Sequence, residues 1–168
     1  MPLNPESPLT RLMLAPVRPG RVVWIGVRSA RREPLVEVRS VLASAEAGLE
    51  GDHYSRKGGN RQVTLIEAES LRAIAGFLGR ERVSPFDLRR NIVTEGINLH
   101  ALKDRRFRIG GAVLHITGEC HPCSRMEETF GVGRYNAVRG FGGMTARVVE
   151  AGIIETGSSV EPLLSPQT

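Results

Sequence analysis

The chain has 168 residues, of which 40% are hydrophobic and 24% are charged, and this length and composition indicate a single ordinary soluble domain. No apolar run approaches the roughly 20 residues that a membrane-spanning helix needs, and residues 1–19 lack the pattern of a signal peptide. The two cysteines, Cys120 and Cys123, are too few for a secreted disulfide framework. We therefore expect a cytoplasmic protein without a membrane partner.

The net charge of +5 comes from arginine, because Lys57 and Lys103 are the only lysines. Guanidinium groups bind phosphate and carboxylate in a bidentate way, so an anionic ligand is one explanation and a solvated arginine-rich surface is the other. The arginines are scattered, aromatic residues make up 5% of the chain, and no nucleic-acid motif is present. We do not expect a nucleic-acid partner.

In chain order, residues 1–20 predict an irregular N-terminal arm, residues 21–163 the folded domain, and residues 164–168 a short tail. Strands are predicted where β-branched residues dominate or apolar and polar residues alternate, at 21–27, 35–42, 61–66, 88–94, 107–109, 112–119, 146–151 and 160–163.

Residues 67–78 have the apolar spacing of an amphipathic helix that ends at Gly79. Residues 84–87 predict a turn, and residues 124–130 and 134–138 predict two short helices. Many short strands with glycine turns and few intervening helices favour a mainly β fold. We predict a closed antiparallel β-barrel with one long helix and one or two short helices outside it.

The strand after Gly110-Gly111 leads into the sequence Cys120-His121-Pro122-Cys123. A thiol between a strand end and a helix start is near free backbone N–H groups, which lower its pKa. A structural zinc site would need a second pair of ligands, a thioredoxin-like site would need a βαβ unit, and two buried thiols could simply pack. A single reactive or metal-ligating thiol is the remaining interpretation, and we predict that it is Cys123 rather than Cys120, which would serve as packing or as a resolving partner.

Several polar segments could hold an anion, although each also has an ordinary structural explanation. Asp52-His53 could be a turn cap, the glycines of Lys57-Gly58-Gly59 could only permit a turn, and Arg90 beside Asn91 could form a salt bridge. Arg139 lies next to a glycine-rich bend that resembles an anion-binding loop.

Together these segments resemble the MOSC domain, named after the C-terminal domain of molybdenum cofactor sulfurase. The resemblance covers about residues 21–163 and rests on 48–53, 61–65, 90–99, 109–123 and 146–154. The chain departs from the family pattern at Lys57, where a histidine or arginine is common, and at Gly157-Ser158, where a Gly-Asp is common.

The resemblance implies a β-barrel in which Cys123 coordinates the molybdenum of a pterin cofactor (molybdopterin), and is thus both the metal ligand and the catalytic residue. The implied cofactor-binding residues are Asp52, His53, Lys57, Gly58, Gly59, Arg61, Arg90, Asn91, Thr117 and Arg139. Related enzymes reduce N-hydroxylated compounds. Because the chain has no iron–sulfur cysteine cluster and no nicotinamide or flavin fingerprint, electrons would come from a partner protein.

The alternative that the resemblance leaves open is a sulfur carrier, which receives sulfur from a donor protein and holds it as a Cys123 persulfide. In either case we expect Cys123, Arg61, Arg90 and Asn91 to line one cleft, with Asp52 and His53 nearby. Polar residues in otherwise apolar strands are costly to bury, and a shared face toward solvent or a ligand would explain them.

Overall fold

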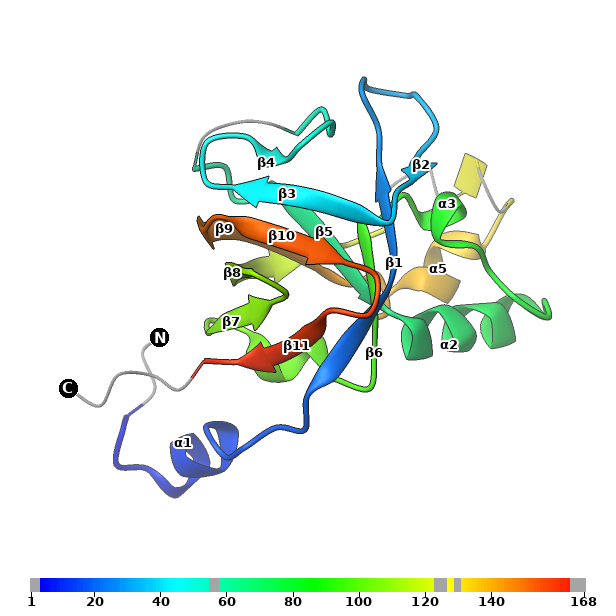
Figure 1. The fold of residues 1–168 in the computed structure, drawn as a ribbon. Coiled ribbons are helices and arrows are strands. Elements are labelled where there is room, and N and C mark those ends of the chain that lie inside the picture. Colours follow the sequence, from blue (N-terminus) through cyan, green and yellow to red (C-terminus); the bar gives the residue numbers. More distant parts are fainter. Residues whose placement is uncertain (1–3, 55–57, 123–126, 129–130, 164–168) are drawn as a thin grey trace.

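Seven strands close into a barrel in the computed structural model, which describes residues 4–54, 58–122, 127–128 and 131–163 (Figure 1). Their order around the barrel is β11-β7-β8-β9-β5-β6-β1, and pairing of β1 with β11 completes the closure. The strands are β1 (Gly20–Val27), β5 (Val63–Glu67), β6 (Ile92–Glu95), β7 (Arg106–Ile109), β8 (Ala112–Glu119), β9 (Met144–Glu150) and β11 (Ser159–Pro162). The predicted mainly β barrel is confirmed.

One pair of strands departs from the antiparallel pattern that the sequence predicted. Strands β5 and β6 are parallel, with Leu65 opposite Ile92. The intervening chain forms α2 (Ala68–Leu78) and the one-turn helix α3 (Pro85–Leu88), which return the chain to the end where β5 began. A parallel pair requires such a crossover, and it brings the residues before β5 and before β6 to the same end of the barrel.

A second, three-stranded sheet contains β10 (Gly152–Glu155), β3 (Ser40–Ser44) and β4 (Gly48–Leu49). The strand predicted over residues 35–42 is divided between β3 and the two-residue β2 (Val36–Glu37), which pairs with β1. The sequence did not predict β4 or β10 as strands, because they are too short for alternation to be recognised. The strand predicted at 88–94 begins only at Ile92.

Helix α2 packs on the outside of the barrel, as predicted, and ends at Gly79, whose φ of 65° is the left-handed conformation that glycine favours. Its buried residues are Leu71, Ile74, Ala75 and Leu78. The predicted turn at 84–87 is instead the start of α3, which begins with a capping box between Ser84 and Asp87. Two further helices are the predicted α5 (Arg134–Val138) and the 3₁₀ helix η1 (Leu99–Leu102).

The N-terminal arm is not wholly irregular, since it contains the short helix α1 (Pro8–Met13), which lies outside the barrel (Figure 1). The Ser7 hydroxyl caps it by accepting the backbone N–H of Thr10 at 3.1 Å, and Pro8 occupies the first turn. The prediction missed this helix because proline-rich segments with little periodicity carry a weak helix signal. No described helix is long and apolar enough to cross a membrane.

The buried apolar residues form two clusters. The larger fills the barrel and includes Phe107, Leu65 and Leu114, and the smaller lies between α2, α5 and the outer face of the sheet. Burial of apolar area at about 25 cal/mol per Å² is the main stabilising term for such cores. The filled interior confines any ligand site to the ends of the barrel or its surface.

Candidate functional site

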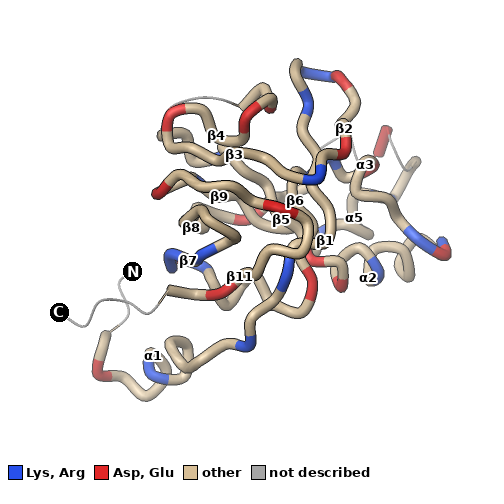
Figure 2. The backbone as a smooth tube through the Cα atoms, viewed as in Figure 1, with Lys and Arg blue, Asp and Glu red and all other residues tan. Residues whose placement is uncertain are grey.

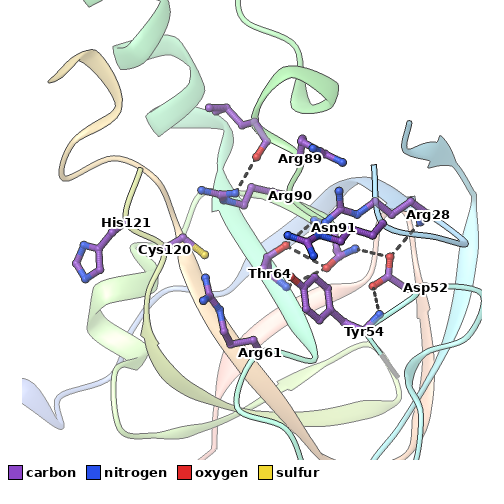
Figure 3. Close-up of a pocket in the computed structure, with 12 residues that line it drawn as sticks. Arg28, Asp52, Tyr54, Arg61, Thr64, Arg89, Arg90, Asn91, Cys120 and His121 are labelled. Carbon is purple, nitrogen blue, oxygen red and sulfur yellow. Dashed lines mark hydrogen bonds between the residues drawn. The ribbon is translucent and has the colours of Figure 1, made fainter. Parts of the chain in front are cut away.

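A pocket of about 320 Å³ lies where the ends of several elements meet, and its size falls within the range of ordinary ligand sites. The end of β1, the start of β5, the segment before β6 and the end of β8 all contribute residues (Figure 3). The lining consists of Arg28, Arg31, Asp52, Tyr54, Arg61, Thr64, Leu88, Arg89, Arg90, Asn91, Cys120 and His121.

The buried Asn91 connects three of these segments at the floor of the pocket. Its side-chain oxygen accepts hydrogen bonds from the Thr64 backbone N–H at 3.1 Å and the Thr64 hydroxyl at 3.0 Å. Its amide nitrogen donates to the Gly26 carbonyl at 3.1 Å and to the Asp52 carboxylate at 3.3 Å. Because these four bonds use the usual capacity of the amide, Asn91 is a positioning residue for the pocket.

Asp52 is buried and fixes the loop that follows β4. One carboxylate oxygen accepts the Arg28 backbone N–H at 3.0 Å as well as the Asn91 amide, and the other accepts the Tyr54 backbone N–H at 3.3 Å. The sequence interpretation of Asp52 as a turn residue and its interpretation as a site residue are therefore compatible. Its bonds hold Arg28 and Tyr54 in the pocket wall.

Arg90 is held in place by two backbone carbonyl groups. Its Nε donates to Gly142 at 2.7 Å, and one terminal nitrogen donates to Leu88 at 2.7 Å. Gly142 also passes so close to the strand end of β8 that a Cβ atom there would collide with the Cys120 carbonyl oxygen. The glycine-rich bend at 139–143 thus contributes through close backbone packing behind Arg90 and Cys120.

Cys120 is the thiol that the described part of the chain places in the pocket, and its side chain is 5% exposed. Burial raises the pKa of the thiol above its ordinary value, while the nearby positive charges of Arg90 and Arg61 act in the opposite direction. In Figure 3 the sulfur lies on the side of Arg61 and Arg90, whereas the His121 ring points away. Cys120 is therefore a mainly protonated thiol within reach of two guanidinium groups.

The charge of the lining is strongly unbalanced. Among the described residues, five arginines line the pocket with a single carboxylate, that of Asp52. Within the described residues no ion pair joins Arg28, Arg61 or Arg90 to an acidic side chain. Elsewhere the positive and negative residues are spread along the chain (Figure 2), so this pocket concentrates charge that the sequence shows only as scattered arginines. Such a site attracts anions.

The structure brings four of the predicted site residues, Asp52, Arg61, Arg90 and Asn91, into this pocket. His53 is adjacent to it, and its ring packs on Tyr54 with centroids 4.2 Å apart. Their role in ligand binding stays a prediction. Cys123 and Lys57 lie outside the described residues, as does most of the predicted helix over 124–130.

Besides His53, four described residues of the predicted site are not part of the pocket lining: Gly58, Gly59, Thr117 and Arg139. The Thr117 hydroxyl bonds to the Asn60 carbonyl and lies 2.9 Å from the Thr145 hydroxyl, so it ties β8 to β9 and to the loop before β5. Arg139 is exposed at the end of α5. Gly58 bonds to the Ala45 carbonyl at 3.4 Å through its N–H, which serves a turn.

The sequence analysis missed Arg28, Arg31, Tyr54, Thr64 and Arg89 as pocket residues. Arg28 and Arg31 follow the end of β1, and single arginines in a connecting loop carry no local signal. The one available indication was position, since Arg28 directly follows the strand predicted at 21–27.

Comparison with known proteins agrees with the β-barrel fold and identifies the family. The family model for the MOSC domain matches residues 51–161, which is more than half of the chain. No match was found among curated proteins.

Among solved structures, the YuaD protein from Bacillus subtilis superposes with a TM-score of 0.73 and 18% identity, over 86% of this chain and 96% of its own. YiiM from Escherichia coli gives 0.65 and 18%, over 85% of this chain and 69% of its own. YiiM from Geobacillus stearothermophilus gives 0.70 and 16%, over 86% and 75%. At such identities the structural likeness establishes the fold alone, and the family-model match establishes that this chain belongs to the MOSC domain family.

Proposed function

We propose that this MOSC domain binds a molybdenum-pterin cofactor in the arginine-lined pocket, with the Cys123 thiolate as the protein ligand of the metal. The observation that carries the proposal is the meeting of five arginines with the strand end that bears Cys120 in one pocket. Cys123 follows Cys120 by three residues in the sequence. A soft thiolate suits molybdenum, and guanidinium groups suit a phosphate.

The chemistry of the pocket residues fits such a cofactor. Arg61 and Arg90 would bind an anionic group, and the partly exposed Tyr54 ring offers a flat surface beside the pocket for a planar heterocycle. Asp52 and Asn91 would act indirectly, since their hydrogen bonds hold Arg28, Tyr54 and Thr64 in the pocket wall. The pocket residues therefore orient the ligand, and no proton transfer is assigned to them.

When bound, the cofactor would supply two-electron chemistry for the reduction of N-hydroxylated or similar oxygenated substrates. The electrons would come from a donor protein, and we propose the cytoplasm as the site of this activity. The arginines would favour neutral or anionic substrates over cationic ones, because a cation approaching the pocket is repelled by their net positive charge.

A second candidate function is sulfur transfer, and the presence of Cys120 in the pocket favours it. In this case the Cys123 thiolate attacks the outer sulfur of a donor protein's persulfide, and the donor departs as a thiolate. The new Cys123 persulfide is anionic, so the same arginines would stabilise it. Cys120 would then be the nearby thiol able to receive the sulfur or to release it as disulfide forms.

Elemental analysis separates the two functions. Protein purified from a host that makes the molybdenum-pterin cofactor should contain about one molybdenum per chain, and Cys123→Ser should lose it while remaining folded. Metal-free protein with one cyanide-labile sulfur, lost in the same variant, would instead support the carrier. Cys120→Ser is the matched control, since it removes a thiol of the same segment that is not assigned to the metal. Neither molybdenum nor labile sulfur in the wild-type protein would refute both.

A further inference from the structure

A second pocket, of about 270 Å³, adjoins the arginine-lined pocket. Two segments contribute to both pockets: the loop between β1 and β2, and α3 with the residues that follow it. Arg31 lines the first pocket, Arg32 lines the second, and Arg89 lines both. We call the first the arginine pocket and the second the side pocket, which is lined by residues 32–35 and by Phe86, Asp87 and Arg89.

The side pocket has no excess of charge. Among its described lining residues, two arginines, Arg32 and Arg89, stand with two carboxylates, Glu33 and Asp87. The arginine pocket, in contrast, has five arginines and one carboxylate among the described residues that line it. The potential of a pocket follows the sum of its charges. The side pocket therefore suits an uncharged group, whereas the arginine pocket suits an anion.

An aromatic ring forms part of the side-pocket wall. Phe86 is 45% exposed, and its ring packs edge-on with the Trp24 ring, with centroids 5.2 Å apart and an angle of 78° between the planes. This contact holds the Phe86 ring while leaving much of it open, and Pro34 and Leu35 add apolar surface from the loop after β1. Because aromatic rings attract one another beyond the area that they bury, a held and exposed ring favours another ring as its neighbour.

Two residues of the side pocket have a backbone conformation that is rare outside glycine. The φ angles of Arg32 and Arg89 are 72° and 59°. Arg89 is the C-cap of α3, where its N–H bonds to the Pro85 carbonyl, and glycine is the usual residue at such a position. Backbone conformations of this kind are costly and cluster at ligand sites. Arginine in place of glycine puts a long side chain in the wall that the two pockets share.

The size of the side pocket is also sufficient for a ring, since a cavity of about 150 Å³ can hold benzene and this pocket has about 270 Å³. We propose that the side pocket is a subsite for an uncharged aromatic ring, carried by a ligand whose anionic group lies in the arginine pocket. This goes beyond the proposed function, because it concerns a pocket that the cofactor proposal does not use.

The test compares phosphate esters with and without a ring by titration calorimetry, on protein from a host that does not make the cofactor. Benzyl phosphate is compared with methyl phosphate, and 4-phenylbutyl phosphate with butyl phosphate, so that each pair differs only in the ring. Two linker lengths are used because the ring must reach from one pocket into the other. At least one ring-bearing probe should bind roughly tenfold more tightly than its ring-free counterpart.

Phe86→Ala should bring this affinity ratio close to one without weakening the ring-free probes, and Phe86→Leu should give an intermediate ratio. The matched control is Phe77→Ala. Phe77 is also exposed, at 60%, and also packs edge-on with another ring, that of Phe141, but it lines neither pocket. The control should keep the wild-type ratio, and circular dichroism verifies that each variant is folded.

The contribution of charge is measured separately with inorganic phosphate and tripolyphosphate, which have no ring. Arg61→Gln removes charge-assisted hydrogen bonds, so it should weaken tripolyphosphate roughly tenfold while the ratio between ring-bearing and ring-free probes stays the same. Phe86→Ala should leave tripolyphosphate binding unchanged. The charge control is Arg147→Gln, which makes the same charge change at an exposed position of β9 outside the lining of the arginine pocket and should affect no probe.

Four results would overturn the inference: equal binding within both pairs of probes, a ratio that survives Phe86→Ala, an equal loss in Phe77→Ala, or no binding of any phosphate. The outcome is separable from the proposed function. If the ring gives no advantage while molybdenum is found at one per chain, the subsite is wrong and the cofactor proposal stands. If the ring advantage depends on Phe86 while the protein never contains molybdenum or labile sulfur, the subsite stands and the cofactor proposal fails.

Discussion

The two ends of the parallel pair β5–β6 carry opposite charges, and the charged side chains at the two ends differ in how they are hydrogen-bonded to the rest of the chain. At the beginning of these strands lies the arginine pocket, and at their end lies another pocket of about 320 Å³, lined by Glu67, Glu69, Ser70, Gly96, Ile97 and Asn98. At this acidic end, Glu67 accepts the Leu99 N–H at 3.0 Å and the Ser70 hydroxyl at 2.9 Å, and Glu69 accepts the Gly96 N–H at 2.8 Å.

The comparison separates structural charge from functional charge. The acidic side chains are matched by donors from the chain itself, so they serve to hold the turn after β6 against the start of α2. In the arginine pocket, the positive charges outnumber the negative charges that the described residues supply. Groups that remain uncompensated inside a pocket mark a ligand site more reliably than the mere presence of charged residues.

The largest effect on stability should come from the acidic end. Glu67→Ala would leave the buried Leu99 N–H without its acceptor and would also remove the Ser70 bond, at a cost of about 3 kcal/mol in the free energy of unfolding. Urea denaturation measures this loss. Phosphate binding to the folded variant should be unchanged, and a weakened affinity would show that the two ends are not independent.

A smaller loss is expected for Asn91→Ala, at about 2 kcal/mol, because its bonds to Thr64, Gly26 and Asp52 disappear together. Unlike Glu67→Ala, this variant should also bind phosphate more weakly, since the wall that holds Arg28 would loosen. Denaturation and calorimetry on the same preparation test both statements. Loss of stability with full affinity would show that Asn91 supports the fold and not the pocket.

Arg61→Gln should change the stability of the ligand-free protein by less than about 0.5 kcal/mol, as is usual for exposed positions. With tripolyphosphate at a hundred times the wild-type dissociation constant, the added stability should fall by about 1.3 kcal/mol if the affinity drops tenfold. Thermal unfolding with and without the probe measures the difference. A destabilised ligand-free protein would mean that Arg61 is structural, like the glutamates at the other end.

The smallest effect concerns pH and Cys120. Burial raises the pKa of the Cys120 thiol in the folded protein, so the folded state favours the protonated thiol. Once the pH passes the pKa that the thiol has in the unfolded chain, ionisation stabilises the unfolded state. The free energy of unfolding therefore falls as the pH rises from that value toward the higher pKa of the folded protein. Stability should therefore decline above about pH 8.5, less so in Cys120→Ala. Denaturation between pH 7 and pH 10 tests this, and identical profiles for both proteins would contradict it.

The same property bears on the two thiols. Cys120 should react slowly with iodoacetamide near neutral pH, since its thiol is buried and protonated. The sequence analysis predicts that Cys123 reacts faster, and mass-mapped alkylation of the reduced protein decides this. Equal rates, or faster reaction at Cys120, would remove the reason for assigning the metal to Cys123.

The sequence predicted the barrel, helix α2 and part of the site because these depend on local patterns. The alternation of apolar and polar residues through β8 and the apolar spacing of residues 68–78 can each be recognised within their own segment. Asp52, Arg61, Arg90 and Asn91 were found because they form unusual polar pairs beside glycines or apolar strands. Arg28, Arg31 and Arg89 were not found, because only the crossover between β5 and β6 and the loop after β1 bring them to one place.

The parallel pairing of β5 with β6 was missed for a related reason. The sequence predicts a helix over residues 67–78 and a turn at 84–87, but nothing in residues 88–94 tells whether the next strand runs beside β5 or elsewhere in the barrel. The Thr64–Asn91 bonds fix that register, and they too depend on contact between distant segments. Long-range pairing is thus where the sequence alone was insufficient.

The most direct test of the account is the molybdenum content of Arg61→Gln and Arg28→Gln, compared with Arg147→Gln, after expression in a host that makes the cofactor. If the arginine pocket binds the cofactor, the two pocket variants should contain well under half of the molybdenum of the wild-type protein, while the control retains it. Wild-type molybdenum in both pocket variants, with all proteins folded, would contradict the assignment of this pocket as the cofactor site.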